Sequence, residues 1–124
     1  MAKKKSVKDY NKERKLWSNW KTTIRKTWEN EWEHKKTGAI LNLSSEGPGP
    51  HSNEATWDLV MSYPMGSSGS AHLGREYGGP GDYMSSDDRY AKKSLMKQAK
   101  RFMKQSNNYT TTKQFKQLTK RYKP

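Results

Sequence analysis

The segment from Ser6 to Lys36, SVKDYNKERKLWSNWKTTIRKTWENEWEHKK, constrains the fold most, because it holds four of the chain's five tryptophans and neither proline nor glycine. At 100° per residue, its large apolar side chains project into one helical sector about 120° wide. These side chains are Tyr10, Trp17, Trp20, Ile24, Trp28 and Trp32. Gly38 follows as a natural helix stop. The spacing predicts a long helix over residues 6–36.

The composition changes after Gly38. Gly, Ser and Pro supply 21 of the 43 positions from 44 to 86, a mixture typical of loops. Two apolar stretches interrupt this region, at residues 39–43 and 56–63, and the alternation in the second favours a two-stranded ribbon. A single helical turn over Trp57, Val60 and Met61 is the alternative for the second stretch. Residues 64–86 show no period and are expected to form an extended loop.

Two further helices are predicted near the C-terminus. Asp87 and Asp88 suit the positive end of a helix over residues 88–106. Thr111 and Gln114 have the Thr-x-x-Gln form of a capping box, which predicts a third helix reaching about Tyr122.

The predicted fold class is mainly α: a long N-terminal helix packed with a C-terminal helical pair, joined by a Gly/Ser/Pro-rich loop region with at most a short β-ribbon. The length of 124 residues predicts one small domain. We divide it into a basic arm (1–5), the long helix (6–36), a loop-rich insert (37–86) and a basic helical hairpin (87–124). The expected core comprises Trp17, Trp20, Ile24, Trp28, Leu95, Ala99, Phe102, Phe115 and Leu118.

Charge is strongly segregated along the chain. Residues 1–36 carry 12 Lys/Arg against 5 Asp/Glu, a net of +7. Residues 37–85 carry 1 against 5, a net of −4, and residues 86–124 carry 12 against 2, a net of +10. Charge this polarised indicates a polyanionic partner rather than a solubility device.

Phosphate contact is the expected use of the basic helix faces, because each neutralised phosphate releases a counterion. Such contacts are largely independent of base sequence, although the C-terminal helical pair also allows a helix-turn-helix interpretation. The candidate nucleic-acid-binding residues are Lys3, Lys4, Lys5, Arg14, Lys15, Arg25, Lys26, Lys93, Lys97, Lys100, Arg101, Lys104, Lys116, Lys120 and Arg121.

Neither a catalytic centre, a metal site nor a cofactor is predicted. The chain has no cysteine, and His34, His51 and His72 occur in no metal-ligand signature. We therefore expect a protein without enzymatic activity, with a nuclease as the alternative if His51 or His72 meets an acid.

The sequence thus predicts a small basic protein that binds RNA or DNA, within a ribonucleoprotein or virion assembly that includes other proteins. The alternative is a protein-binding module, perhaps viral in type, that docks on an acidic protein surface through residues 44–86. A membrane role for the tryptophan stripe ranks lower. The N-terminal residues lack an apolar signal region, so we expect a location in the cytoplasm or inside a particle, without classical secretion.

Overall fold

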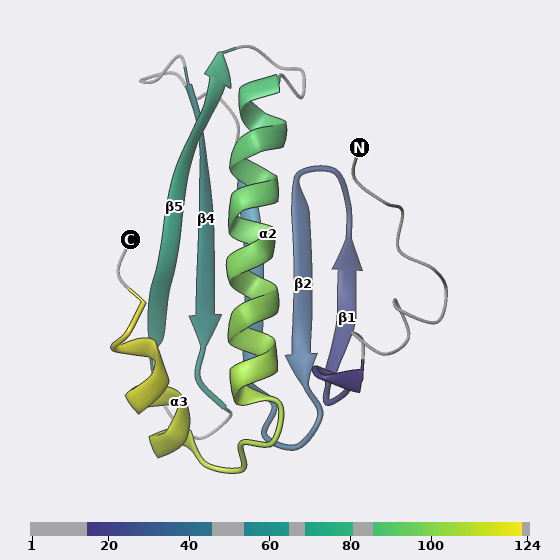
Figure 1. Ribbon diagram of the computed structural model, residues 1–124, viewed down its shortest axis with the longest axis vertical. Helices are drawn as coiled ribbons and strands as arrows, with labels where there is room; N and C mark the ends of the chain where they lie inside the picture. The colour runs from purple at the N-terminus through teal and green to yellow at the C-terminus, as the bar shows by residue number, and fades with distance from the viewer. Residues whose placement is uncertain (1–14, 46–53, 65–68, 81–85, 123–124) are drawn as a thin grey trace, which may run out of the picture.

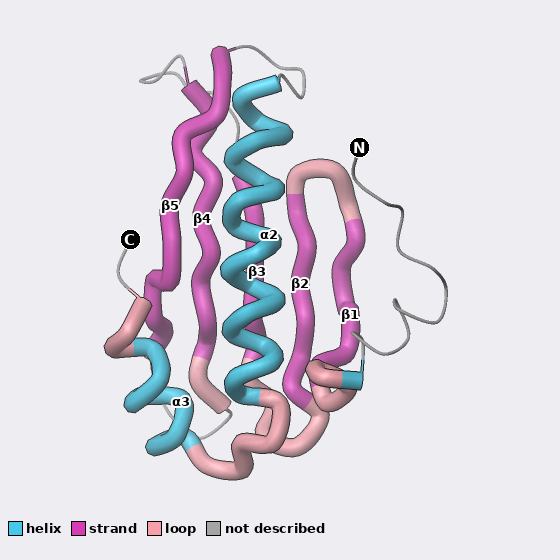
Figure 2. Tube along the Cα trace, viewed as in Figure 1, coloured by secondary structure: helices cyan, strands magenta, loops and turns pink. Residues whose placement is uncertain are grey.

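Five strands form one antiparallel sheet, and two C-terminal helices pack against it (Figure 1). The computed structural model describes residues 15–45, 54–64, 69–80 and 86–122. The strands lie in sequence order, β1-β2-β3-β4-β5, so each pairs with its neighbour along the chain. Helix α2 runs along one face of the sheet, nearly parallel to the strands, while α3 lies beside the lower ends of β4 and β5 (Figure 2).

The strands are β1 (Trp20–Arg25), β2 (Glu29–His34), β3 (Ile40–Ser45), β4 (Glu54–Ser62) and β5 (Ser70–Pro80). The helices are α2 (Ser86–Ser106) and α3 (Thr112–Thr119).

The predicted long helix over residues 6–36, and with it the mainly α fold class, is wrong. Residues 20–34 form the β1–β2 hairpin, in which Trp20 lies opposite His34 and Thr22 opposite Trp32. The four-residue spacing of Trp20, Ile24, Trp28 and Trp32 fits a helix, but it is also a multiple of the two-residue period of a strand. Thr22 and Thr23 favour a strand, and Trp20 and Trp32 are buried on one face of the hairpin. The membrane interpretation depended on that helix and is set aside.

The loop-rich insert over residues 37–86 is also a wrong prediction for most of its described length. The ribbon of residues 39–43 and 56–63 is confirmed by β3 and β4, with Leu41 opposite Met61 and Leu43 opposite Leu59. The predicted loop, however, contains the eleven-residue strand β5. Its glycines look like loop residues, but Gly74 lies so close to α2 that an added Cβ would lie 2.8 Å from a Leu95 methyl carbon.

Both predicted C-terminal helices are present. Thr111 caps α3 through the expected reciprocal bonds with Gln114. On α2, the apolar stripe of Ala91, Leu95 and Ala99 is fully buried against the sheet. The core residues expected from the sequence are buried, except that Ile24 and Trp28 are half-buried.

Trp57 joins the N-terminal end of α2 to the sheet. Its buried indole Nε1 donates a 3.0 Å hydrogen bond to the carboxylate of Asp88 in the first turn of α2. The Trp28 ring stacks on it with centroids 5.5 Å apart. Gly78 of β5 lies beside Trp57 and Asp88, and a Cβ at Gly78 would overlap the Asp88 carboxylate.

Asn107, directly after α2, joins the other end of the helix to the hairpin. The Asn107 carbonyl accepts hydrogen bonds from Asn19 Nδ2 at 2.8 Å and from His34 Nε2 at 2.9 Å. The Asn107 side-chain oxygen accepts from the Asn19 amide at 2.8 Å. Burial lowers the pKa of His34, which favours the neutral ring, and Nδ1 accepts a hydrogen bond from the Thr37 hydroxyl. The helix is therefore fixed at both ends.

Replacing Gly78→Ala should lower the free energy of unfolding by about 1–3 kcal/mol, because the new methyl group displaces Asp88 from Trp57. In an Asp88→Ala background the same change should cost clearly less, since the clashing carboxylate is gone. Urea denaturation of the four proteins measures this coupling. An equal cost in both backgrounds would contradict the proposed contact.

Candidate functional site

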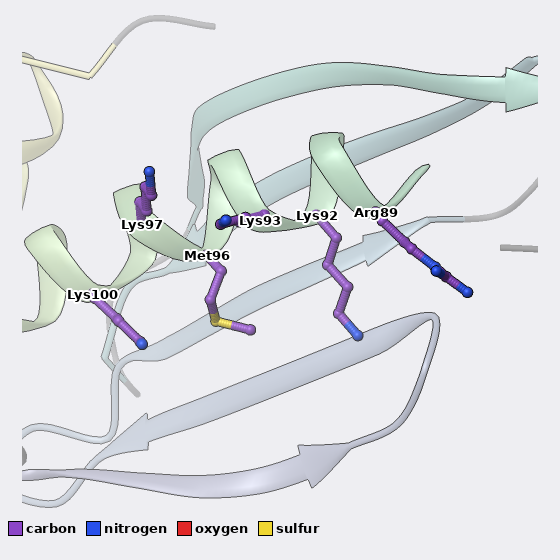
Figure 3. Close-up of a pocket in the computed structure, with 6 residues that line it drawn as sticks. All are labelled: Arg89, Lys92, Lys93, Met96, Lys97 and Lys100. Carbon is purple, nitrogen blue, oxygen red and sulfur yellow. The ribbon is translucent and has the colours of Figure 1, made fainter. Parts of the chain in front are cut away.

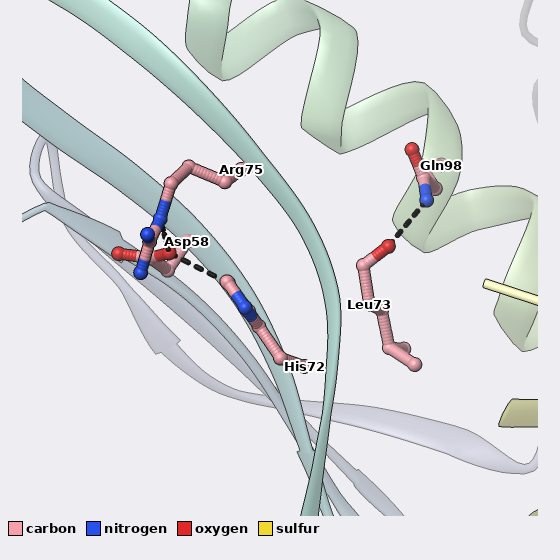
Figure 4. Close-up of polar contacts among 5 residues, drawn as sticks. All are labelled: Asp58, His72, Leu73, Arg75 and Gln98. Atoms are coloured by element: carbon pink, nitrogen blue, oxygen red, sulfur yellow. Dashed lines mark hydrogen bonds and ion pairs between the residues drawn. The ribbon is translucent and has the colours of Figure 1, made fainter. Parts of the chain in front are cut away.

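The two flanks of α2 differ in chemistry. On the flank toward β5, the neutral side chains of Gln98 and Ser94 bond to the sheet. Gln98 Nε2 donates to the Leu73 carbonyl at 2.6 Å (Figure 4), and the Ser94 hydroxyl donates to Glu76 at 3.3 Å. The flank toward the β1–β2 hairpin is basic. The same helix that completes the core therefore presents a cationic side.

A pocket of about 490 Å³ lies along the basic flank, and we call it the lysine pocket. Its lining residues are Arg89, Lys92, Lys93, Met96, Lys97 and Lys100. Figure 3 shows Arg89, Lys92, Met96 and Lys100 projecting from α2 toward the hairpin, and Lys97 turned away from the sheet. From Arg89 to Lys100 the helix rises about 16 Å at 1.5 Å per residue. Five cations therefore share a single short surface.

Lys92 has a structural role within this pocket. Its Nζ donates to the Thr27 carbonyl at 2.8 Å and to the Lys26 carbonyl at 3.4 Å, and lies 6.0 Å from the Trp57 ring centroid. Burial lowers the pKa of Lys92. The ammonium group thus ties the β1–β2 turn to α2, and its donors face protein carbonyls.

The other four cations, Arg89, Lys93, Lys97 and Lys100, form what we call the basic stripe. Within the described ranges, none of them contacts a carboxylate, and the sequence has no Asp or Glu after Asp88. Arg89 and Lys93, and Lys93 and Lys97, are like-charged pairs at four-residue spacing, each of which destabilises a helix by about 0.2–0.5 kcal/mol. Such an arrangement is unfavourable for the free protein and is relieved by an external anion.

The remaining predicted contact residues lie in several places. Arg101 and Arg121 meet at a second pocket of about 260 Å³ on the opposite flank of α2, together with Gln98, Gln105 and Tyr122. The Lys116 ammonium group lies 5.6 Å from the centroid of the Tyr63 ring. The exposed residues Lys104 and Lys120 lie in α2 and just after α3 respectively.

The N-terminal candidates are only partly described. Lys3, Lys4, Lys5 and Arg14 lie outside the described residues, as does His51. Lys15 is exposed before β1. Arg25 and Lys26 are exposed at the β1–β2 turn. The bond from Lys92 places the Lys26 backbone beside α2, so Lys26 joins the basic region from the sheet side.

The structure adds Arg89 and Lys92 to the residues selected from the sequence. Arg89 could have been found, because it lies four residues before Lys93 on the same helical face. The role of Lys92 depends on carbonyl groups of the β1–β2 turn, a segment that the sequence predicts to be helical.

The face of the sheet turned away from α2 has a different charge. On β2, Glu29 and Glu31 both accept hydrogen bonds from the Asn42 side chain, at 2.9 Å and 3.2 Å. The Thr23 hydroxyl donates to the second oxygen of Glu31 at 3.0 Å. These partners are neutral groups rather than cations. This part of the face is unsuited to a polyanion.

His72 does meet an acid on that face. Asp58 Oδ1 accepts from Arg75 Nε at 2.9 Å and lies 2.6 Å from His72 Nε2 (Figure 4). The cluster borders a pocket of about 310 Å³ with Ser44 and Val60. The side chains of Asp58, His72 and Arg75 are all partly exposed, as is usual for polar contacts at a protein surface.

In the described part of the chain, no group of three or more His, Asp or Glu side chains is placed to hold a metal ion. None of the helices there is both long enough and apolar enough to cross a bilayer.

No family model, curated protein or solved structure matches this chain significantly.

Lys97→Glu should stabilise the free protein by about 1 kcal/mol, because it converts two repulsive four-residue pairs, with Lys93 and Arg101, into attractive ones. Lys97→Gln, which only removes the repulsion, is the matched variant and should gain about half as much. Urea denaturation at low salt measures both, and added salt should shrink both gains. If Lys97→Glu is no more stable than Lys97→Gln, the stripe carries no electrostatic strain.

Proposed function

We propose that this is a small, non-enzymatic nucleic-acid-binding protein whose basic stripe on α2 contacts the phosphate backbone, largely without regard to base sequence. The observation that carries the proposal is the set of four uncompensated cations along one face of a rigid helix. A partner rich in phosphate supplies the negative charge that the described part of the protein does not.

The spacing and rigidity of the stripe support this assignment. Four cations over about 16 Å give a linear charge density comparable with that of a nucleic-acid strand, which carries a phosphate about every 3.4 Å in a duplex. Attachment of α2 through Trp57 and Asn107 fixes which flank is exposed. On the opposite face of the sheet, Glu29 and Glu31 have neutral hydrogen-bond partners, so this part of the face disfavours a polyanion.

An assembly with other proteins remains part of the proposal, as expected for accessory proteins of ribonucleoprotein particles or virions. The alternative is docking on an acidic protein through residues 44–86. Much of that segment is β4 and β5 rather than the expected loop. The connecting segments 46–53, 65–68 and 81–85 lie outside the described residues.

Binding to labelled RNA and DNA, measured by fluorescence anisotropy from about 50 to 200 mM salt, should show an affinity that falls steeply with salt. The triple variant Lys93→Gln, Lys97→Gln, Lys100→Gln should reduce the slope of log K against log salt by about 2, since about 0.7 counterions are released per contact with a single strand.

A matched variant, Lys21→Gln, Lys35→Gln, Lys113→Gln, removes the same charge from exposed positions outside the lysine pocket. It should keep nearly the wild-type slope. Absence of binding at low salt, or a flat slope, would contradict the function. Equal losses in the two triple variants would contradict the location on α2.

A further inference from the structure

Tyr90 is an exposed aromatic residue at the edge of the basic stripe. It is 71% exposed on the second turn of α2, between Arg89 and the fully buried Ala91. At 100° per residue, Tyr90 lies on the same side of the helix as Lys93 and Lys97, three and seven residues further on. The ring therefore lies next to Lys93 and Lys97 on the outward surface of α2.

Exposed large apolar side chains are rare in the described residues. Only Leu16, Tyr77 and Tyr90 are in this class, and Tyr90 is the one on α2. No hydrogen bond or ring contact within the described ranges holds the Tyr90 side chain. Its aromatic face is thus available to a ligand that the stripe attracts.

We propose that the basic stripe takes a single strand of nucleic acid, with phosphates on Arg89, Lys93 and Lys97 and an unpaired base stacked on Tyr90. This inference rests on the proposed function and narrows its substrate class. An aromatic ring among cations binds single strands because every base presents a flat face, whereas the bases of a duplex are already stacked on one another. Stacking of this kind is tolerant of base identity, in keeping with phosphate-dominated contact.

Three ligands of about 12 nucleotides separate base stacking from phosphate contact. They are an unpaired strand with bases, the same backbone with abasic sites, and the matching duplex. The strand with bases is made both as RNA and as DNA. Wild-type protein should bind the strand with bases more tightly than the abasic strand or the duplex. Tyr90→Leu should weaken binding to the strand with bases by roughly 5- to 100-fold, and should leave the abasic strand unaffected.

Two further variants serve as controls. Tyr90→Phe keeps the ring and should retain the preference for bases. Tyr77→Leu, which removes an exposed tyrosine from β5, should change nothing. Circular dichroism and thermal unfolding of each variant confirm that the fold is kept.

The possible results separate base stacking on Tyr90 from phosphate binding by the basic stripe. Equal binding of strands with and without bases, tighter binding to the duplex, or no effect of Tyr90→Leu would overturn base stacking while leaving phosphate contact intact. Failure of all three ligands to bind at low salt would instead overturn the proposed function.

Discussion

The packing of α2 on the sheet determines which side chains of this helix are exposed to solvent. Ala91, Leu95 and Ala99 are buried on one side of the helix. Burial of a side chain the size of Leu95 stabilises the fold by about 1.5–3 kcal/mol. The small alanines allow close approach to the strands. Because this contact fixes the rotation of α2, it also decides which residues face outward.

Polar contacts at the two ends remove the remaining freedom. Asp88 holds Trp57 at one end, and Asn107 accepts from Asn19 and His34 at the other. These bonds are buried or half-buried, where an unpaired donor or acceptor would be costly. The result is a rigid helix whose cations lie at fixed spacing, so binding need not order them first. Charge repulsion within the stripe is tolerated because the core and the end contacts outweigh it.

Some of this organisation could be read from the sequence. The signals specific to helices, namely the acids before α2 and the capping box of Thr111 and Gln114, correctly located both C-terminal helices. The spacing of the tryptophans could not distinguish a helix from a strand, because a four-residue spacing fits both. Strand β5 was missed because Gly74 and Gly78, which permit close contact with α2 and with Asp88, have the composition of a loop. Only tertiary packing distinguishes these cases.

The positions of the α2 lysines could be predicted from the sequence, because the helix that carries them does form. Lys93, Lys97 and Lys100 were selected because they lie off the apolar stripe of a helix that does form. Arg25 and Lys26 are predicted on a first helix, but residues 20–34 form the β1–β2 hairpin, so their position relative to α2 could not be anticipated. Lys92 shows the limit most clearly, because its partners are backbone carbonyls of the β1–β2 turn.

The most direct test of the central claim is an amide chemical-shift titration of the ¹⁵N-labelled protein with a short single-stranded oligonucleotide at low salt. The largest shifts should fall on residues 89–101 of α2 and on the adjoining β1–β2 turn, and they should reverse on addition of salt. Shifts concentrated around Asp58, His72 and Glu31 on the opposite sheet face, or no shifts at all, would contradict it.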